Sequence, residues 1–186
     1  ARGYPEMFIH ANDEWWGDQL KGERDSFIAL DEAGGKAFVA VMQTPFYDQV
    51  GDVLHRPVLN AGIGKYIHFA ARKYEPAESL HHWAELAKAG SFDRVRRDPR
   101  FRKAIDGMHR YGNRIYTYMN PVAGMPLPEL QRRNEGLGLW RVGFDGTMTW
   151  AYTHIIGDPV NQAMMFSKVY RTDDGVLDTL CWEGYR

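Results

Sequence analysis

The chain has 186 residues, which is enough for one sizeable hydrophobic core and short for two. Its formal net charge is −1 with acidic and basic residues mixed along the sequence, which argues against a protein that binds nucleic acid or an anionic membrane through charge. No apolar run approaches the roughly 20 residues that span a bilayer, and the single cysteine, Cys181, excludes an internal disulfide bond.

The first third of the sequence alternates between apolar stretches and amphipathic ones. Residues 7–10 predict a short buried strand, and residues 36–42 are nearly all apolar and predict a second. Between them, residues 17–33 place apolar side chains among charged ones as an amphipathic helix does, and a glycine pair ends that helix. A short helix and a third strand, over residues 46–53 and 56–60, complete a β-α-β-α-β pattern.

The middle of the chain, residues 64–112, is predicted to be helical, in two or three segments separated by proline and glycine. Its arginines are interrupted by aspartates, which favours a solvated helix face over a phosphate-binding patch. Neighbouring residues His81 and His82 point apart on a helix, so we expect no metal site there. We also expect no other cofactor.

The remaining sequence returns to the strand and helix alternation. Residues 114–119 predict a fourth strand that ends at Asn120, residues 129–142 a helix, and residues 147–152 a fifth strand. Residues 157–186 read as an appended strand or loop with a turn at 173–175, and then the beginning of a helix.

Five strands separated by helical crossovers predict an α/β fold with a parallel sheet. Polar or aromatic residues gather at the carboxyl ends of the strands, as in (β/α) barrels: Asp13, Glu14, Gln43, Asn60, Asn120 and Tyr152. A complete (β/α)8 TIM-type barrel needs about 250 residues. We therefore expect residues 1–156 to form strands four to eight of such a barrel, and residues 157–186 a truncated carboxyl-terminal extension. A self-contained five-stranded doubly wound domain is the alternative.

This reading makes the chain a part of a larger protein. The sequence begins at Ala1 without a methionine and enters its first strand within a few residues, which favours a processed or partial product. The missing half of the barrel would come from the rest of the parent chain, and an isolated piece could be inactive.

The acid pair Asp13–Glu14 follows the first strand and precedes Trp15 and Trp16. Two adjacent carboxylates repel each other, and partial burial beside indoles favours protonation of one of them. One acid could then be protonated while the other is charged, which is the division that glycoside hydrolysis uses. The alternative is that one of the two caps the following helix.

Several segments together resemble the carboxyl-terminal part of the glycoside hydrolase family 123 catalytic domain and its uncharacterised relatives. They are Arg132-Arg133, Gly138-Leu139-Trp140, Gly143-Phe144-Asp145-Gly146, Thr149-Trp150-Ala151-Tyr152, and Trp182-Glu183 before Tyr185-Arg186. The family also carries an adjacent Asp-Glu pair after its fourth strand, which Asp13 and Glu14 match. Its members often have an aromatic residue before this pair and a proline after it, where this chain has Asn12 and Trp15.

The resemblance implies a retaining exo-β-N-acetylgalactosaminidase that uses the 2-acetamido group of its own substrate as the nucleophile. Asp13 would orient and polarise that amide, and Glu14 would protonate the leaving oxygen and then activate water. The partner molecule would be a glycan or glycoconjugate, and the family favours a secreted or periplasmic location. Both galacto- and gluco-configured substrates are compatible with this resemblance.

Six further residues are candidates for sugar binding, and each has a structural alternative. Trp150 could form a wall of the acetamide pocket or fill the interior, and Tyr118 and Tyr152 could donate to the acetamide carbonyl or be core residues. Asn60 and Asn120 could bind hydroxyls or be turn residues. His10 could contact substrate, although a satisfied buried histidine is the more common case. Three other residues, Arg132, Trp140 and Asp145, are expected to tie the last helix to its turn.

Two other functions stay open at this point. A non-catalytic carbohydrate-binding barrel would keep the aromatic cleft without turnover. A conventional two-carboxylate glycosidase would act on neutral sugars, with its nucleophile elsewhere in the chain.

Overall fold

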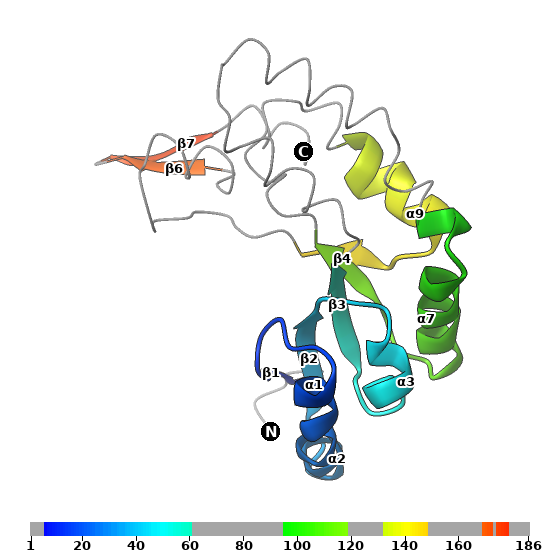
Figure 1. Cartoon of the computed structure of the whole chain (residues 1–186). Helices are drawn as coiled ribbons and strands as arrows, with labels where there is room; N and C mark the ends of the chain where they lie inside the picture. The colour runs from blue at the N-terminus through cyan, green and yellow to red at the C-terminus, as the bar shows by residue number, and fades with distance from the viewer. Residues whose placement is uncertain (1–5, 61–94, 119–131, 149–168, 173, 179–186) are drawn as a thin grey trace.

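The structure is a computed structural model that describes residues 6–60, 95–118, 132–148, 169–172 and 174–178 (Figure 1). Its main feature is a five-stranded sheet in which the strands lie side by side in chain order. The strands are β1 (Phe8–His10), β2 (Lys36–Val41), β3 (Arg56–Asn60), β4 (Tyr116–Tyr118) and β5 (Gly146–Thr147). Every neighbouring pair is parallel, which confirms the predicted α/β class.

Helices connect these strands. They are α1 (Asp18–Gly22), α2 (Arg24–Glu32), α3 (Phe46–Val50), α7 (Pro99–Arg110) and α9 (Leu139–Val142). Local sequence sets the start of α7, because the Asp98 carboxylate accepts a hydrogen bond of 2.9 Å from the backbone N–H of Arg100, and Pro99 occupies the first turn. Helix α9 ends at Gly143, whose positive φ of 88° suits glycine.

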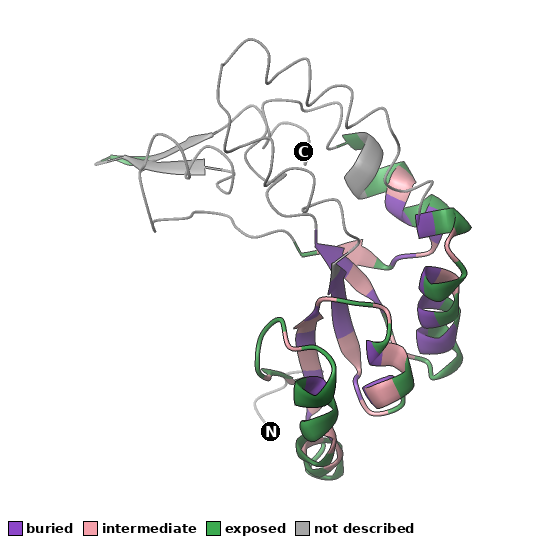
Figure 2. Cartoon of the chain, in the orientation of Figure 1, coloured by how far each residue is buried: buried purple, intermediate pink, exposed green. Residues whose placement is uncertain are grey.

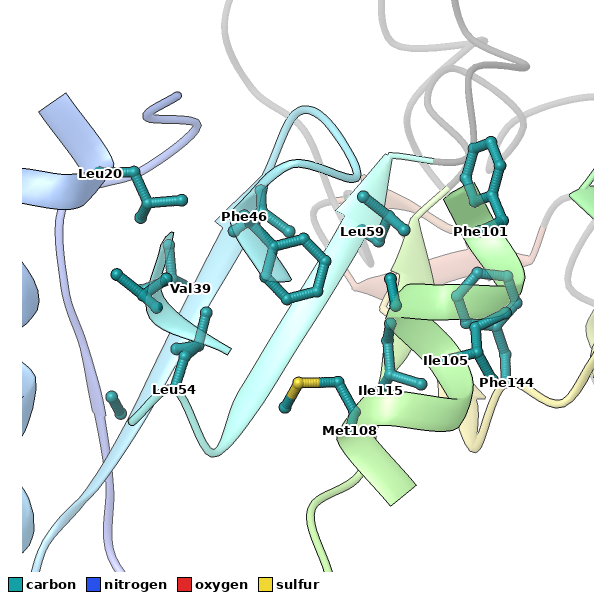
Figure 3. Close-up of a cluster of buried hydrophobic side chains, with 14 of the residues drawn as sticks. Leu20, Val39, Phe46, Leu54, Leu59, Phe101, Ile105, Met108, Ile115 and Phe144 are labelled. Carbon is teal, nitrogen blue, oxygen red and sulfur yellow. The ribbon is translucent and has the colours of Figure 1, made fainter. Parts of the chain in front are cut away.

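The hydrophobic core lies between the sheet and these helices. Side chains alternate along β2, so that Ala37, Val39 and Val41 are buried against the helices and the residues between them face the other way. Figure 3 shows the cluster, and Figure 2 shows that α7 turns its buried residues toward the sheet. Helix residues in this cluster are Leu20, Phe27, Phe46, Val50, Phe101, Ala104, Ile105, Met108, Leu139 and Val142.

The opposite face of the sheet carries a cation among aromatic rings. The guanidinium carbon of Arg56 lies 4.2 Å from the ring centre of Phe8 and 5.2 Å from that of Tyr116. Tyr118 comes two residues after Tyr116 on β4 and so lies on this same face, and it pairs with Asn60 at the carboxyl edge of the sheet. The two faces therefore differ in chemistry, with a packed apolar core on one and aromatic and polar groups on the other.

Most predicted elements of the first third are confirmed, with two corrections. The helix predicted over residues 17–33 is present as α1 and α2, divided at Glu23. The strand predicted over residues 7–10 is present but is not buried, since Met7 is 58% and Ile9 42% exposed. In the described sheet β1 pairs with β2 alone, and an edge strand keeps one flank open.

Later elements are confirmed in the parts that the structure describes. Helix α7 falls within the predicted helical region, and β4 within the fourth predicted strand. The helix predicted over residues 129–142 contains a π-helical segment, η2 (Arg133–Gly138), before α9. Of the strand predicted over residues 147–152, Thr147 lies in β5, which begins one residue earlier than predicted, Met148 does not, and residues 149–152 lie outside the described residues.

A separate hairpin follows near the carboxyl end. Strands β6 (Val169–Thr172) and β7 (Gly175–Asp178) pair antiparallel, with Thr172 opposite Gly175, so the predicted turn is present. The predicted division at residues 156 and 157 and the predicted terminal helix lie outside the described residues. In the ranges that the structure describes, no helix is long and apolar enough to cross a bilayer.

Candidate active site

The segment after β1 places an acid at the carboxyl edge of the sheet. It stays beside β2, because the N–H of Ala11 donates to the carbonyl of Phe38 at 3.3 Å and the N–H of Glu14 donates to that of Ala40 at 3.1 Å. Glu14 has a φ of 54°, the one positive φ at a residue other than glycine among the described residues. Such a conformation costs about 1–3 kcal/mol, and residues that keep it cluster at functional sites.

The carboxylate of Glu14 is held by a tyrosine from the fourth strand. The hydroxyl of Tyr118 donates a hydrogen bond of 2.8 Å to Oε1 of Glu14 and lies 3.0 Å from Sδ of Met42. Tyr118 itself is 5% exposed, whereas Glu14 is open to solvent. The contact joins the first and fourth strands of the sheet at their carboxyl ends, where parallel α/β folds bind ligands.

Asp13 has a different partner from Glu14. Its Oδ1 lies 3.6 Å from Nε2 of His10, and the two side chains are 62% and 48% exposed. The ring of His10 also lies 5.2 Å from that of Phe38, on the face of the sheet away from the helices. Each acid of the pair is therefore accessible from solvent and oriented by its own neighbour.

The capping alternative for the acid pair is wrong. Helix α1 begins at Asp18, its N-cap residue is Gly17, and no side chain caps it. Of the two indoles, Trp15 is partly buried against the core, and Trp16 is 57% exposed beside the acids. Neither Asp13 nor Glu14 is thus explained by the start of the following helix.

Some of the other predicted site residues lie in the described part of the chain, and the rest lie outside it. Asn60 is the register partner of Tyr118, so its backbone lies at the same edge as the acid pair. His10 is half exposed, so the expectation of a buried histidine is wrong. Three candidates lie outside the described residues: Asn120, Trp150 and Tyr152.

Met42 belongs to this site and was missed from sequence. It follows β2 directly and is the last residue of the apolar run that predicts this strand. Its position at a strand's carboxyl end was the available signal, the same one that singled out Gln43 next to it. Methionine carries a weak acceptor in its thioether, which a hydrophobic pattern conceals.

Asp145 has a structural role, but it differs from the expected one of tying the last predicted helix to its turn. Its Oδ2 accepts a hydrogen bond of 2.8 Å from the N–H of Ile115 and lies 3.0 Å from Nε2 of His109. It therefore ties the turn before β5 to α7 and to the start of β4. Trp140 is 80% exposed and does not provide the packing that was expected of it.

No metal ligand set is assembled within the described residues, where no three histidine, cysteine, aspartate or glutamate side chains lie together. The chemistry that the edge offers is that of carboxylates, a phenol and an imidazole, which can exchange protons with a bound molecule.

A search of protein-family models, of curated proteins and of solved structures finds no match to this chain.

Proposed function

We propose that the chain forms part of a (β/α)8-type barrel with the acid pair at its catalytic end. Two features support this. The five strands follow one another in chain order without the reversal that marks a doubly wound sheet. The helices also contribute to one continuous core on one side of the sheet, as the outer helices of a barrel do.

The function that this site supports best is a glycoside hydrolase, in which Glu14 acts as the general acid and base. The observation that carries the proposal is the hydrogen bond between Tyr118 and Glu14 at the carboxyl edge. The backbone of Glu14 is also strained, with a positive φ, and such a conformation has an energetic cost. Helix capping does not explain that cost, because Glu14 does not cap α1.

The resemblance of the sequence to glycoside hydrolase family 123 adds the substrate and the role of Asp13. The substrate carries a terminal β-linked N-acetylgalactosamine or a related 2-acetamido sugar, which the enzyme removes from the end of the glycan. Asp13 orients and polarises the acetamido N–H, so that the carbonyl oxygen attacks the anomeric carbon and displaces the leaving oxygen, which Glu14 protonates. Glu14 then takes a proton from the water that opens the cyclic intermediate, and the configuration of the sugar is retained.

Neighbouring groups suit these roles. His10 lies 3.6 Å from Oδ1 of Asp13, which leaves the second oxygen of Asp13 for a substrate amide. The exposed indole of Trp16 offers a flat apolar surface of the kind that sugar rings pack against.

The proposal is tested by assaying the native protein at full length on three nitrophenyl glycosides: β-N-acetylgalactosaminide, β-N-acetylglucosaminide and plain β-galactoside. Cleavage of an acetamido sugar with no cleavage of the plain galactoside supports participation of the substrate amide. Cleavage of the plain galactoside at a similar rate contradicts it and favours a two-carboxylate enzyme. Binding of the sugars without cleavage of any contradicts catalysis and favours a carbohydrate-binding barrel.

A further inference from the structure

Three side chains from three separate segments meet at the carboxyl edge of the sheet. Glu14 comes from the segment after β1, Met42 from the residue after β2, and Tyr118 from the end of β4. The phenolic oxygen of Tyr118 is 2.8 Å from Oε1 of Glu14 and 3.0 Å from Sδ of Met42. A phenol has one hydroxyl hydrogen, so it donates to one of these two acceptors at a time.

The charge of Glu14 determines which acceptor receives that hydrogen. A carboxylate is a much stronger acceptor than a thioether, and hydrogen bonds to charged groups are roughly twice as strong as neutral ones. While Glu14 is ionised, Tyr118 therefore donates to it.

Protonation of Glu14 reverses the direction of this hydrogen bond. A protonated carboxyl carries an O–H donor, and the phenolic oxygen can accept from it. The hydroxyl hydrogen of Tyr118 then turns to Sδ of Met42, which is already within reach. Tyr118 and Glu14 therefore share a hydrogen bond in both states.

We propose that Tyr118 is a positioning residue that holds the carboxyl group of Glu14 in one place in both protonation states, with Met42 as the second acceptor. The catalytic use of this exchange rests on the proposed function, because a general acid that later serves as a base passes through both states in each turnover. The exchange itself is a property of the folded chain and can be measured without substrate.

The test is a pH titration of the full chain by NMR, with ¹³C labels at the side-chain carboxyl carbon of glutamate and at Cζ of tyrosine. The signals of Glu14 and Tyr118 are expected to move with the same midpoint. His10 and Asp13 are the titratable groups on the same segment as Glu14, and Tyr118 faces it from β4. An Asp13→Asn variant, which removes one of them, is expected to keep the Glu14 and Tyr118 midpoints equal to each other.

One substitution is expected to change how Tyr118 responds to Glu14. Met42→Leu removes the acceptor that the protonated state uses, so the Tyr118 signal changes less across the Glu14 titration than in the wild type. Matched controls are Tyr116→Phe, whose hydroxyl on the same strand contacts Arg56 instead, and Met148→Leu, and both are expected to leave the Tyr118 response as in the wild type.

A Tyr118 signal that stays constant while Glu14 titrates would overturn the proposal. A Tyr118 response in Met42→Leu that equals the wild-type response would do so as well. The results separate this proposal from the proposed function. Equal midpoints for Glu14 and Tyr118 without sugar cleavage would reject the glycosidase activity and keep the hydrogen-bond exchange. Sugar cleavage with a constant Tyr118 signal would reject the exchange and keep the activity.

Discussion

Tyr118 and Glu14 are joined by a hydrogen bond of 2.8 Å although 104 positions separate them in the sequence. Parallel pairing puts the carboxyl ends of β1 and β4 at the same edge of the sheet, and the segment after β1 lies beside β2, where the N–H of Glu14 donates to the carbonyl of Ala40. The strained φ of Glu14 points to a carboxylate whose position matters.

Replacing Tyr118 by Phe is expected to lower kcat about tenfold on an acetamido substrate with little change in KM. One hydrogen bond to a charged group is lost, and its net contribution of roughly 1.5 kcal/mol corresponds to about that factor. Tyr116→Phe makes the same chemical change two residues away on the same strand and should retain the wild-type kcat. Equal losses in the two variants would show that the effect is general to β4.

Leu54→Ala is expected to lower the free energy of unfolding by about 2–5 kcal/mol, because this side chain is fully buried in the hydrophobic core and its loss leaves a cavity. It lies within the cluster that Figure 3 shows. Urea unfolding followed by circular dichroism measures the change. The control is Leu137→Ala, the same truncation at a residue that is 74% exposed, which should change stability by less than about 0.5 kcal/mol. Similar losses at both positions would contradict the placement of this core.

Asp52 is expected to contribute stability that depends on pH. The guanidinium of Arg24 donates two hydrogen bonds to its carboxylate, and this contact lowers the pKa of Asp52 in the folded chain. A lowered folded pKa means that the stabilisation is present above the unfolded pKa, near 3.9, and is lost as the pH falls through the folded pKa.

Asp52→Asn should therefore cost about 0.2–1 kcal/mol at pH 7, a small value because the side chain is 43% exposed. The difference from the wild type should shrink as the pH falls below about 4. Unfolding in urea at pH 7, 5 and 3 measures it, with Asp174→Asn as an exposed control. A difference that stays constant down to pH 3 would show that the ion pair is not its cause.

Asp145→Ala is expected to cost about 1–3 kcal/mol, because it leaves the backbone N–H of Ile115 without the carboxylate that accepts its hydrogen bond. Ile115 is fully buried, so water cannot easily replace that acceptor. Asp174→Ala makes the same truncation at an exposed turn residue and should be close to neutral. Amide hydrogen exchange at Ile115 gives a local readout, and unchanged protection there would contradict the assigned role.

The sheet could be predicted from sequence because its strands are short apolar runs between amphipathic segments and glycine turns. Two features of this region could not be predicted. The exposure of the first strand depends on which strand lies at the edge of the described sheet, and the division of the following helix at Glu23 depends on the packing of α1 and α2. A local pattern of residues predicts neither of these two features.

The candidate site could be predicted only in part. The position of Glu14 after an apolar strand indicated a site at that edge, but its choice of partner depends on the register between β3 and β4. Tyr118 was predicted as a donor to substrate, and the structure gives its hydroxyl a protein acceptor. Met42 was concealed because a thioether counts as apolar in any pattern of hydrophobic residues.

The central claim, that Glu14 is the general acid and base of a glycoside hydrolase, is tested most directly by one substitution. Glu14→Gln keeps the shape of the side chain and removes its proton exchange, and Glu32→Gln makes the same change on the exposed end of α2. We would measure kcat on an N-acetylhexosaminide with a poor leaving group. The account predicts a loss of about 10²–10⁴-fold for Glu14→Gln and none for Glu32→Gln. A rate for Glu14→Gln within a few-fold of the wild type would contradict it.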